Sequence, residues 1–193
     1  MINEKIISIL SKSVHDTVEK FYEDPENQSL AYSVVGAHIL SEYTGDLYTA
    51  MGGCLQFQTH PGDEEGPYVF AIESDDPDSP DEYHFWIAQL SEQGDKAFPT
   101  SVLDLSTRHF HQMAKNLGIP WQRSAFPEFV WESSTGDVFD LIFEKHGIDI
   151  EFNPDLIDKL DEILAAQEVN LRQVAEQGKK QFLQNIEKLN HDR

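Results

Sequence analysis

The segment from 30 to 40 carries apolar residues on every side of the helix that it is expected to form. Residues 27–29 precede it with side chains able to cap a helix start, and Gly45 follows it, a residue suited to a left-handed helix end. A helix that is apolar all round has to be covered on all sides. The chain must therefore fold so that other elements enclose this helix.

Helical and strand patterns around this segment indicate an α+β fold. Residues 3–22 repeat apolar side chains at three- and four-residue steps, which predicts an amphipathic helix that ends before Pro25. Stretches rich in aromatic and aliphatic residues predict four strands, at 47–58, at 67–72, from His84 onward and at 101–105. Helical patterns follow at 107–117 and 137–146, and a long final helix is predicted from Pro154.

The length of 193 residues suits one ordinary domain with an appendage. We expect an α+β domain over residues 1–152 and a C-terminal helical extension over residues 153–193. The outer part of the extension, rich in Gln, Glu and Lys, could form a homodimer or wrap back on its own domain, and both alternatives stay open. Gly178 interrupts the predicted helix, at a cost of about 1 kcal/mol relative to alanine.

The charge balance limits the classes of partner. Lys and Arg number 14 against 35 Asp and Glu, which gives a net charge of -21. Such a charge repels phosphate backbones and anionic membrane surfaces, so we expect neither nucleic acid nor a membrane as a partner. The start of the chain lacks the pattern of a signal peptide, and no window is apolar enough to span a bilayer. We expect a soluble, cytoplasmic protein of bacterial type.

His84 and Asp104 form the most informative pair of polar residues. The histidine opens one predicted strand, and the carboxylate lies in the next. Residues so placed can orient each other, which is the base half of a nucleophilic triad. Each also has a structural interpretation, because a histidine can bond a buried carbonyl and Asp104 can pair with Arg108. The order of the elements favours a mutual hydrogen bond between His84 and Asp104.

The order of these pieces resembles papain-like and transglutaminase-like proteins over roughly residues 27–105, in particular small uncharacterised bacterial members of that superfamily. The resemblance implies a buried helix packed on a small antiparallel sheet, with a long C-terminal helix added. It also implies acyl transfer or amide hydrolysis by a nucleophile at the start of the buried helix. The matching stretches are Ser29-Leu30-Ala31-Tyr32, Gly52-Gly53, His84-Phe85-Trp86 and Val102-Leu103-Asp104.

The chain departs from the family pattern at the nucleophile, because Ser29 stands where the family carries cysteine. The resemblance therefore implies a Ser29, His84 and Asp104 triad. With such a site, the protein is either a weak hydrolase of amides or esters or a weak acyltransferase. Alternatively, it is a non-catalytic scaffold whose cleft binds a peptide or a small amide or ester. Serine is a weaker nucleophile than a thiol near neutral pH, and Ser29 could instead cap the helix.

Other chemistries find less support in the sequence. Cys54, the single cysteine, lies in a predicted strand, where no helix dipole would lower its pKa. His109 and His111 are two residues apart on a predicted helix and point to different faces, so we predict no metal site. No nucleotide-binding motif appears, and we expect no cofactor. The alternative function is that of an acidic interaction protein that binds a basic or helical partner.

Overall fold

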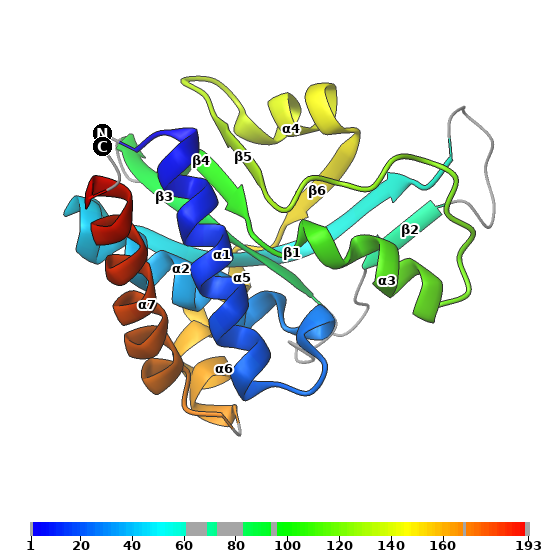
Figure 1. Cartoon of the computed structure of the whole chain (residues 1–193). Coiled ribbons are helices and arrows are strands. Elements are labelled where there is room, and N and C mark those ends of the chain that lie inside the picture. The colour runs from blue at the N-terminus through cyan, green and yellow to red at the C-terminus, as the bar shows by residue number, and fades with distance from the viewer. Residues whose placement is uncertain (1, 61–68, 73–82, 94–95, 168, 192–193) are drawn as a thin grey trace.

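The fold joins one antiparallel sheet to helices that cover both of its faces (Figure 1). The computed structural model describes residues 2–60, 69–72, 83–93, 96–167 and 169–191. Its helices are α1 (Glu4–Phe21), α2 (Ser29–Thr44), α3 (Phe110–Asn116), α4 (Val138–His146), α5 (Asp155–Asp158), α6 (Leu160–Ala166) and α7 (Leu171–His191), with 3-10 turns η1 (Pro25–Asn27) and η3 (Thr107–His109). Its strands are β1 (Tyr48–Gln58), β2 (Val69–Ile72), β3 (His84–Gln93), β4 (Lys96–Asp104), β5 (Val130–Ser133) and β6 (Ile148–Phe152).

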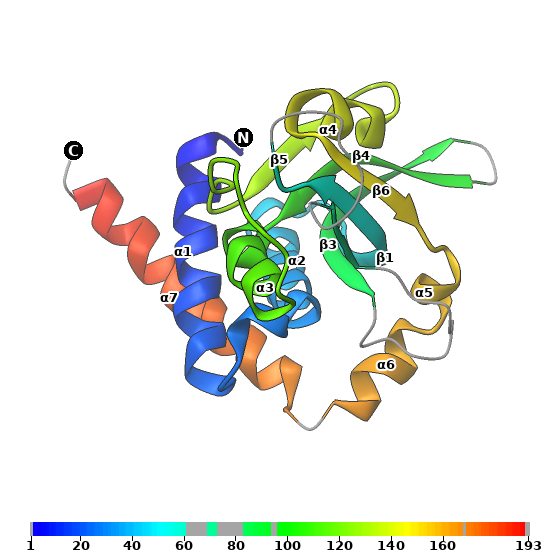
Figure 2. The ribbon, with the colours of Figure 1, turned by 90° about the vertical axis from the view of Figure 1, so that its right-hand side faces the viewer.

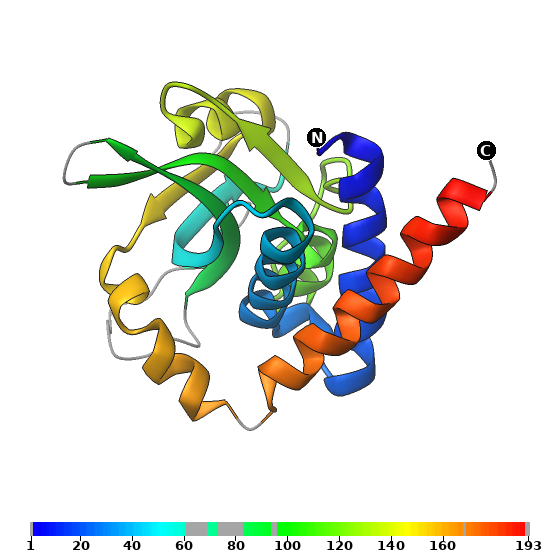
Figure 3. The same ribbon diagram turned by 90° about the vertical axis from the view of Figure 1, so that its left-hand side faces the viewer.

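The helix α2 lies between the sheet and the pair formed by α1 and α7 (Figure 3). Its apolar residues on opposite sides meet both neighbours, as its composition requires. Gly36 allows the approach to the sheet, because a Cβ there would lie 2.4 Å from Ile87 Cδ1. Gly178 does the same for α7, since a Cβ would lie 2.8 Å from Val35 Cγ1. The glycine that weakens α7 as an isolated helix thus permits its close packing on α2.

The predicted final helix is in fact three helices. The chain leaves β6 through α5 and α6 before α7 returns along α1 (Figure 2). Leu171, Val174, Ala175 and Phe182 of α7 are buried in the same core as α1 and α2. The inner part of α7 therefore packs on its own chain. This is the alternative in which the extension wraps back on its own domain.

Strand order places β1 and β3 at the middle of the sheet. The order is β2-β1-β3-β4-β5, and β6 pairs with β1 along Gly53–Phe57, whereas β3 pairs with β1 along Tyr48–Gly53. Alternate residues of β3 face opposite layers: Ile87 packs in the α1, α2 and α7 core, whereas Trp86 packs in the core of α3 and α4. Both β5 and β6 were absent from the sequence prediction. The acidic stretches at 61–66 and 73–82 lie outside the described residues, and no described helix is long and apolar enough to cross a membrane.

Candidate functional site

The sheet brings His84 and Asp104 together. His84 is the first residue of β3 and Asp104 the last of β4, the strand beside it. His84 Nε2 lies 2.7 Å from Asp104 Oδ2, and both side chains are buried. The expected hydrogen bond between these residues is therefore present. Arg108 does not pair with Asp104 and instead contacts Ser11 and Glu128.

The surroundings of Asp104 hold its carboxyl group ionised. Burial would raise the pKa of Asp104, but the attraction and hydrogen bond of His84 and two hydrogen bonds from Ser106 outweigh it and lower the pKa. The Ser106 hydroxyl and backbone N–H both donate to Oδ1, at 2.7 and 2.8 Å. Because an ionised carboxylate only accepts, His84 Nε2 must carry a proton. In the neutral form of a ring protonated at Nε2, the lone pair is on Nδ1.

His84 Nδ1 is buried and has no hydrogen-bond partner within the part of the chain that the structure describes. The imidazole is 1% exposed and packs near the rings of Trp86 and Phe110. Buried polar atoms in folded proteins nearly always have a partner. An unpaired Nδ1 on a ring fixed through Nε2 is thus an exception, and this arrangement suits a base that accepts a proton.

Ser29 is the first residue of α2, and it contacts the backbone of Phe85, the residue that follows His84 in β3. Its Oγ accepts a hydrogen bond of 3.1 Å from the backbone N–H of Phe85. Gln28 occupies the cap position and makes no side-chain cap bond, so the interpretation of Ser29 as the helix cap is wrong. No hydrogen bond joins Ser29 to His84 among the described residues. Among the described residues, the Ser29 hydroxyl donates to no acceptor.

A pocket of about 430 Å³ opens beside Ser29, where η1, the start of β3 and the segment between α6 and α7 meet. His84 and Asp104 do not line it, so the pocket reaches the serine and not the pair behind it. The lining residues are Tyr22, Asp24, Asn27, Gln28, Ser29, Leu30, Tyr83, Phe85, Gln167 and Val169.

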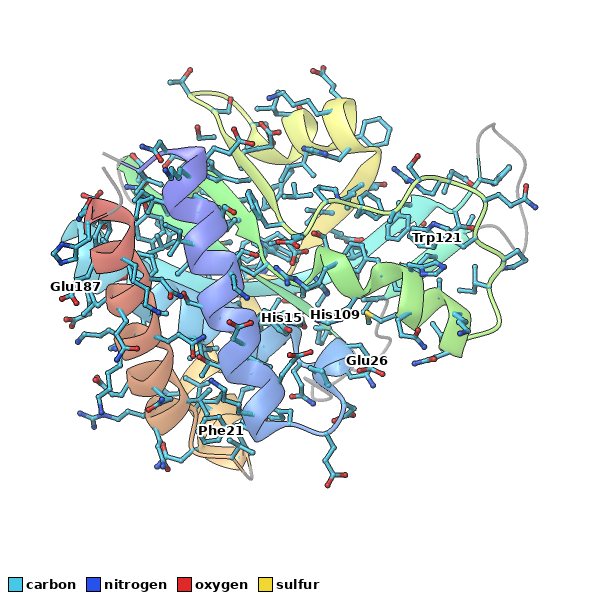
Figure 4. The ribbon with its side chains drawn as sticks, in the orientation of Figure 1. His15, Phe21, Glu26, His109, Trp121 and Glu187 are labelled. Atoms are coloured by element: carbon cyan, nitrogen blue, oxygen red, sulfur yellow. The ribbon has the colours of Figure 1, made fainter. Side chains whose placement is uncertain are left out.

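A second histidine cluster was missed by the sequence analysis. The Tyr32 hydroxyl lies 2.7 Å from His15 Nδ1 and 2.8 Å from His109 Nε2. These residues come from α1, α2 and η3, and Figure 4 shows His15 and His109 facing each other across the space between α1 and η3. Of these three residues, the sequence analysis considered only His109, as a candidate metal ligand. Their separations along the chain, 17 and 77 residues, match no local motif.

This second cluster holds its histidines neutral. Burial, followed by the charge of Arg108, lowers the pKa of His15; burial, His15 and Arg108 lower the pKa of His109 to about 4. His15 Nε2 lies 3.4 Å from a Glu19 carboxylate oxygen, which can only accept. The Tyr32 hydroxyl has one hydrogen to donate, so it donates to one of the two imidazole nitrogens and accepts from the other.

Cys54 lies in a strand, and the two histidines weighed as metal ligands, His109 and His111, have separate partners. Cys54 lies in β1 opposite Glu151 of β6, as the strand prediction required. His109 bonds Tyr32, whereas the His111 ring lies 5.3 Å from that of Trp121. Within the described ranges, no group of three or more His, Cys, Asp or Glu side chains could hold a metal ion.

Comparisons with known proteins bear on the fold alone. No known protein-family profile and no curated protein matches this sequence. One solved structure, named "The crystal structure of genomics APC5867", is similar with a TM-score of 0.54 and 13% sequence identity. The alignment covers 93% of this chain and 79% of that chain. The α+β fold of this chain is therefore similar to that of a somewhat longer chain of known structure.

Proposed function

We propose that the protein has a papain-like or transglutaminase-like fold and catalyses acyl transfer or hydrolysis of an amide or ester at Ser29. The observation that carries the proposal is the His84 and Asp104 hydrogen bond, which leaves His84 Nδ1 unpaired, on a strand whose next residue, Phe85, bonds the Ser29 hydroxyl through its backbone N–H. A buried helix that starts with the nucleophile, beside a histidine and an acid on neighbouring strands, is the arrangement that the sequence resemblance implies.

The reaction begins with attack by Ser29 on an acyl carbon in the pocket. Oγ turns from the Phe85 amide and gives its proton to His84 Nδ1 as it bonds the carbon. Asp104 stabilises the imidazolium that forms and keeps the ring oriented. His84 then protonates the departing amine or alcohol. Water or a second amine, deprotonated by His84, releases the acyl group from Ser29.

The first turn of α2 is suited to the negative charge that develops on the acyl oxygen. Helix N-termini carry backbone N–H groups without a partner inside the helix and a partial positive charge. Gln28 leaves these groups without a side-chain cap, and both Ser29 and Leu30 line the pocket. We assign the backbone N–H groups of these two residues as donors to the oxyanion.

A thiol introduced at Ser29 tests the base. In a Cys54→Ala background, the Ser29→Cys variant should react with iodoacetamide well below the ordinary thiol pKa of about 8.5, because His84 takes its proton. Adding His84→Gln should slow alkylation at pH 6.5 by roughly tenfold or more. The measurement is the alkylation rate from pH 5 to 9, followed by intact mass.

Asn27→Cys in the same background is the matched control. It places a thiol in the same pocket, on η1 and away from His84. The pH dependence of its alkylation rate should be that of an ordinary thiol, and His84→Gln should leave this rate unchanged. Equal pH profiles for the thiols at positions 27 and 29 would contradict the proposed base. Circular dichroism of each variant verifies that the fold is retained.

A further inference from the structure

The pocket beside Ser29 has a distinctive chemistry. Three aromatic side chains, Tyr22, Tyr83 and Phe85, share it with the amides of Asn27, Gln28 and Gln167. Among the lining residues that the structure describes, Asp24 is the one carboxylate, and none is a lysine, arginine or histidine. Aromatic faces and a carboxylate attract cations, whereas an anion would find no compensating charge in this lining.

Tyr22 adds a hydrogen-bonding group to the pocket. Its hydroxyl oxygen is buried and has no partner within the described part of the chain. Burial raises the pKa of Tyr22, so the phenol stays protonated and able to donate at neutral pH. A bound molecule with a carbonyl or hydroxyl oxygen would satisfy this group.

The charge of the whole protein acts in the same direction. The net charge of -21 lowers the local concentration of any anion and raises that of cations. Asp24 contributes locally, since its side chain is exposed and the Asn27 amide approaches its carboxylate at 3.5 Å without neutralising it. The pocket is thus negative for both a local and a global reason.

We infer that the pocket accepts an acyl compound with a positively charged group, an amide or ester that carries a primary or quaternary amine, and excludes anionic acyl compounds. This inference rests on the proposed function for the identity of the reacting group. The charged group lies against Tyr22, Tyr83 and Phe85 near Asp24, while the acyl carbon faces Ser29.

Charged thiol reagents test the preference. In the Cys54→Ala background, the Ser29→Cys variant is reacted separately with a cationic trimethylammonium methanethiosulfonate and with its anionic sulfonate counterpart. Gln184→Cys, on the exposed side of α7, reports the field of the whole protein. The ratio of cationic to anionic rates should be roughly three- to tenfold higher at position 29 than at position 184.

Asp24→Asn should reduce that ratio at position 29 and leave it unchanged at position 184. Equal ratios of cationic to anionic rates at the two positions would overturn the inference. So would a ratio at position 29 that does not change in Asp24→Asn. Because both reagents meet the same thiol, its ionisation cancels from the ratio. Failure of the base at His84 would instead slow both reagents equally, so the two proposals fail in different ways.

Discussion

Two histidine clusters lie close together in the fold, and they differ in the charge of their partners. His84 bonds an ionised carboxylate, Asp104, on the α3 and α4 side of the sheet. His15 and His109 bond a neutral phenol, Tyr32, with the guanidinium of Arg108 nearby. The carboxylate fixes a proton on one nitrogen and leaves the other as a base. In the second cluster burial, together with the charge of Arg108, lowers the pKa of both imidazoles, and the phenol pairs them.

The difference separates a catalytic candidate from a structural one. The Tyr32 cluster satisfies its hydrogen bonds internally and ties α1 to α2 and η3. The His84 pair leaves one buried nitrogen unpaired at the start of β3, where the next residue, Phe85, bonds Ser29 through its backbone N–H. A buried polar atom that lacks a hydrogen-bond partner, on a side chain held in place by its other atoms, is more typical of a reactive site than of a structural network. The following changes test this distinction, from the largest expected effect to the smallest.

Asp104→Ala should have the largest effect. It removes a buried partner from His84 and from the Ser106 hydroxyl and amide, so we expect a loss of about 3 kcal/mol or more in the free energy of unfolding. Glu128→Ala, which removes an exposed partner of Arg108, should cost under about 1 kcal/mol. Urea denaturation measures both. Similar small losses for the two variants would show that the buried pair contributes little.

Tyr32→Phe should have an intermediate effect. It leaves His15 Nδ1 and His109 Nε2 without their shared partner, and both imidazoles are partly accessible to water. We expect a loss of about 1 to 2 kcal/mol in unfolding free energy, measured by urea denaturation. Tyr43→Phe, at an exposed tyrosine of the same helix, is the control and should change stability little. A neutral Tyr32→Phe variant would mean that the cluster does not tie the helices together.

The two clusters should respond to acid in different pH windows. The pKa of His109 is lowered to about 4 from 6.5, so the unfolded chain binds more protons between these values and stability falls as pH drops through this window. We expect a loss on the order of 1 kcal/mol after screening by solvent. The pKa of Asp104 is below 3.8, so its contribution is lost only at lower pH.

Urea denaturation at pH 7, 5.5 and 4.5 measures the first window. His109→Gln should flatten the dependence of stability on pH between 6.5 and 4, because the proton uptake that destabilises the fold is removed. A slope that persists unchanged in this variant would assign the acid response to other groups.

Arg108→Gln should have the smallest effect, confined to the Tyr32 cluster. Burial is the main cause of the lowered pKa of His15 and His109, and the Arg108 charge adds to it. Removing that charge should raise both pKa values, as followed by NMR titration of the imidazole signals. Arg172→Gln, an exposed change of equal charge on α7, should leave them in place.

The sequence predicted the first two helices and the first four strands because their patterns are long or strongly aromatic. It missed β5 and β6, of four and five residues, because such short segments hold too few residues for alternation to stand out. It predicted the pairing of His84 with Asp104 through strand order. The Tyr32 cluster depends on where three separate elements pack, and the pocket beside Ser29 depends on the return of the chain between α6 and α7.

Acylation of the wild-type protein tests the central claim most directly. Incubation with an activated cationic acyl ester, followed by proteolysis and peptide mass spectrometry, locates any acyl group. We predict that Ser29 carries the acyl group, and that Ser29→Ala and His84→Gln abolish this adduct while the fold is retained. An unmodified Ser29, or an adduct at Ser29 that forms equally well in His84→Gln, would contradict a nucleophile activated by the His84 and Asp104 pair.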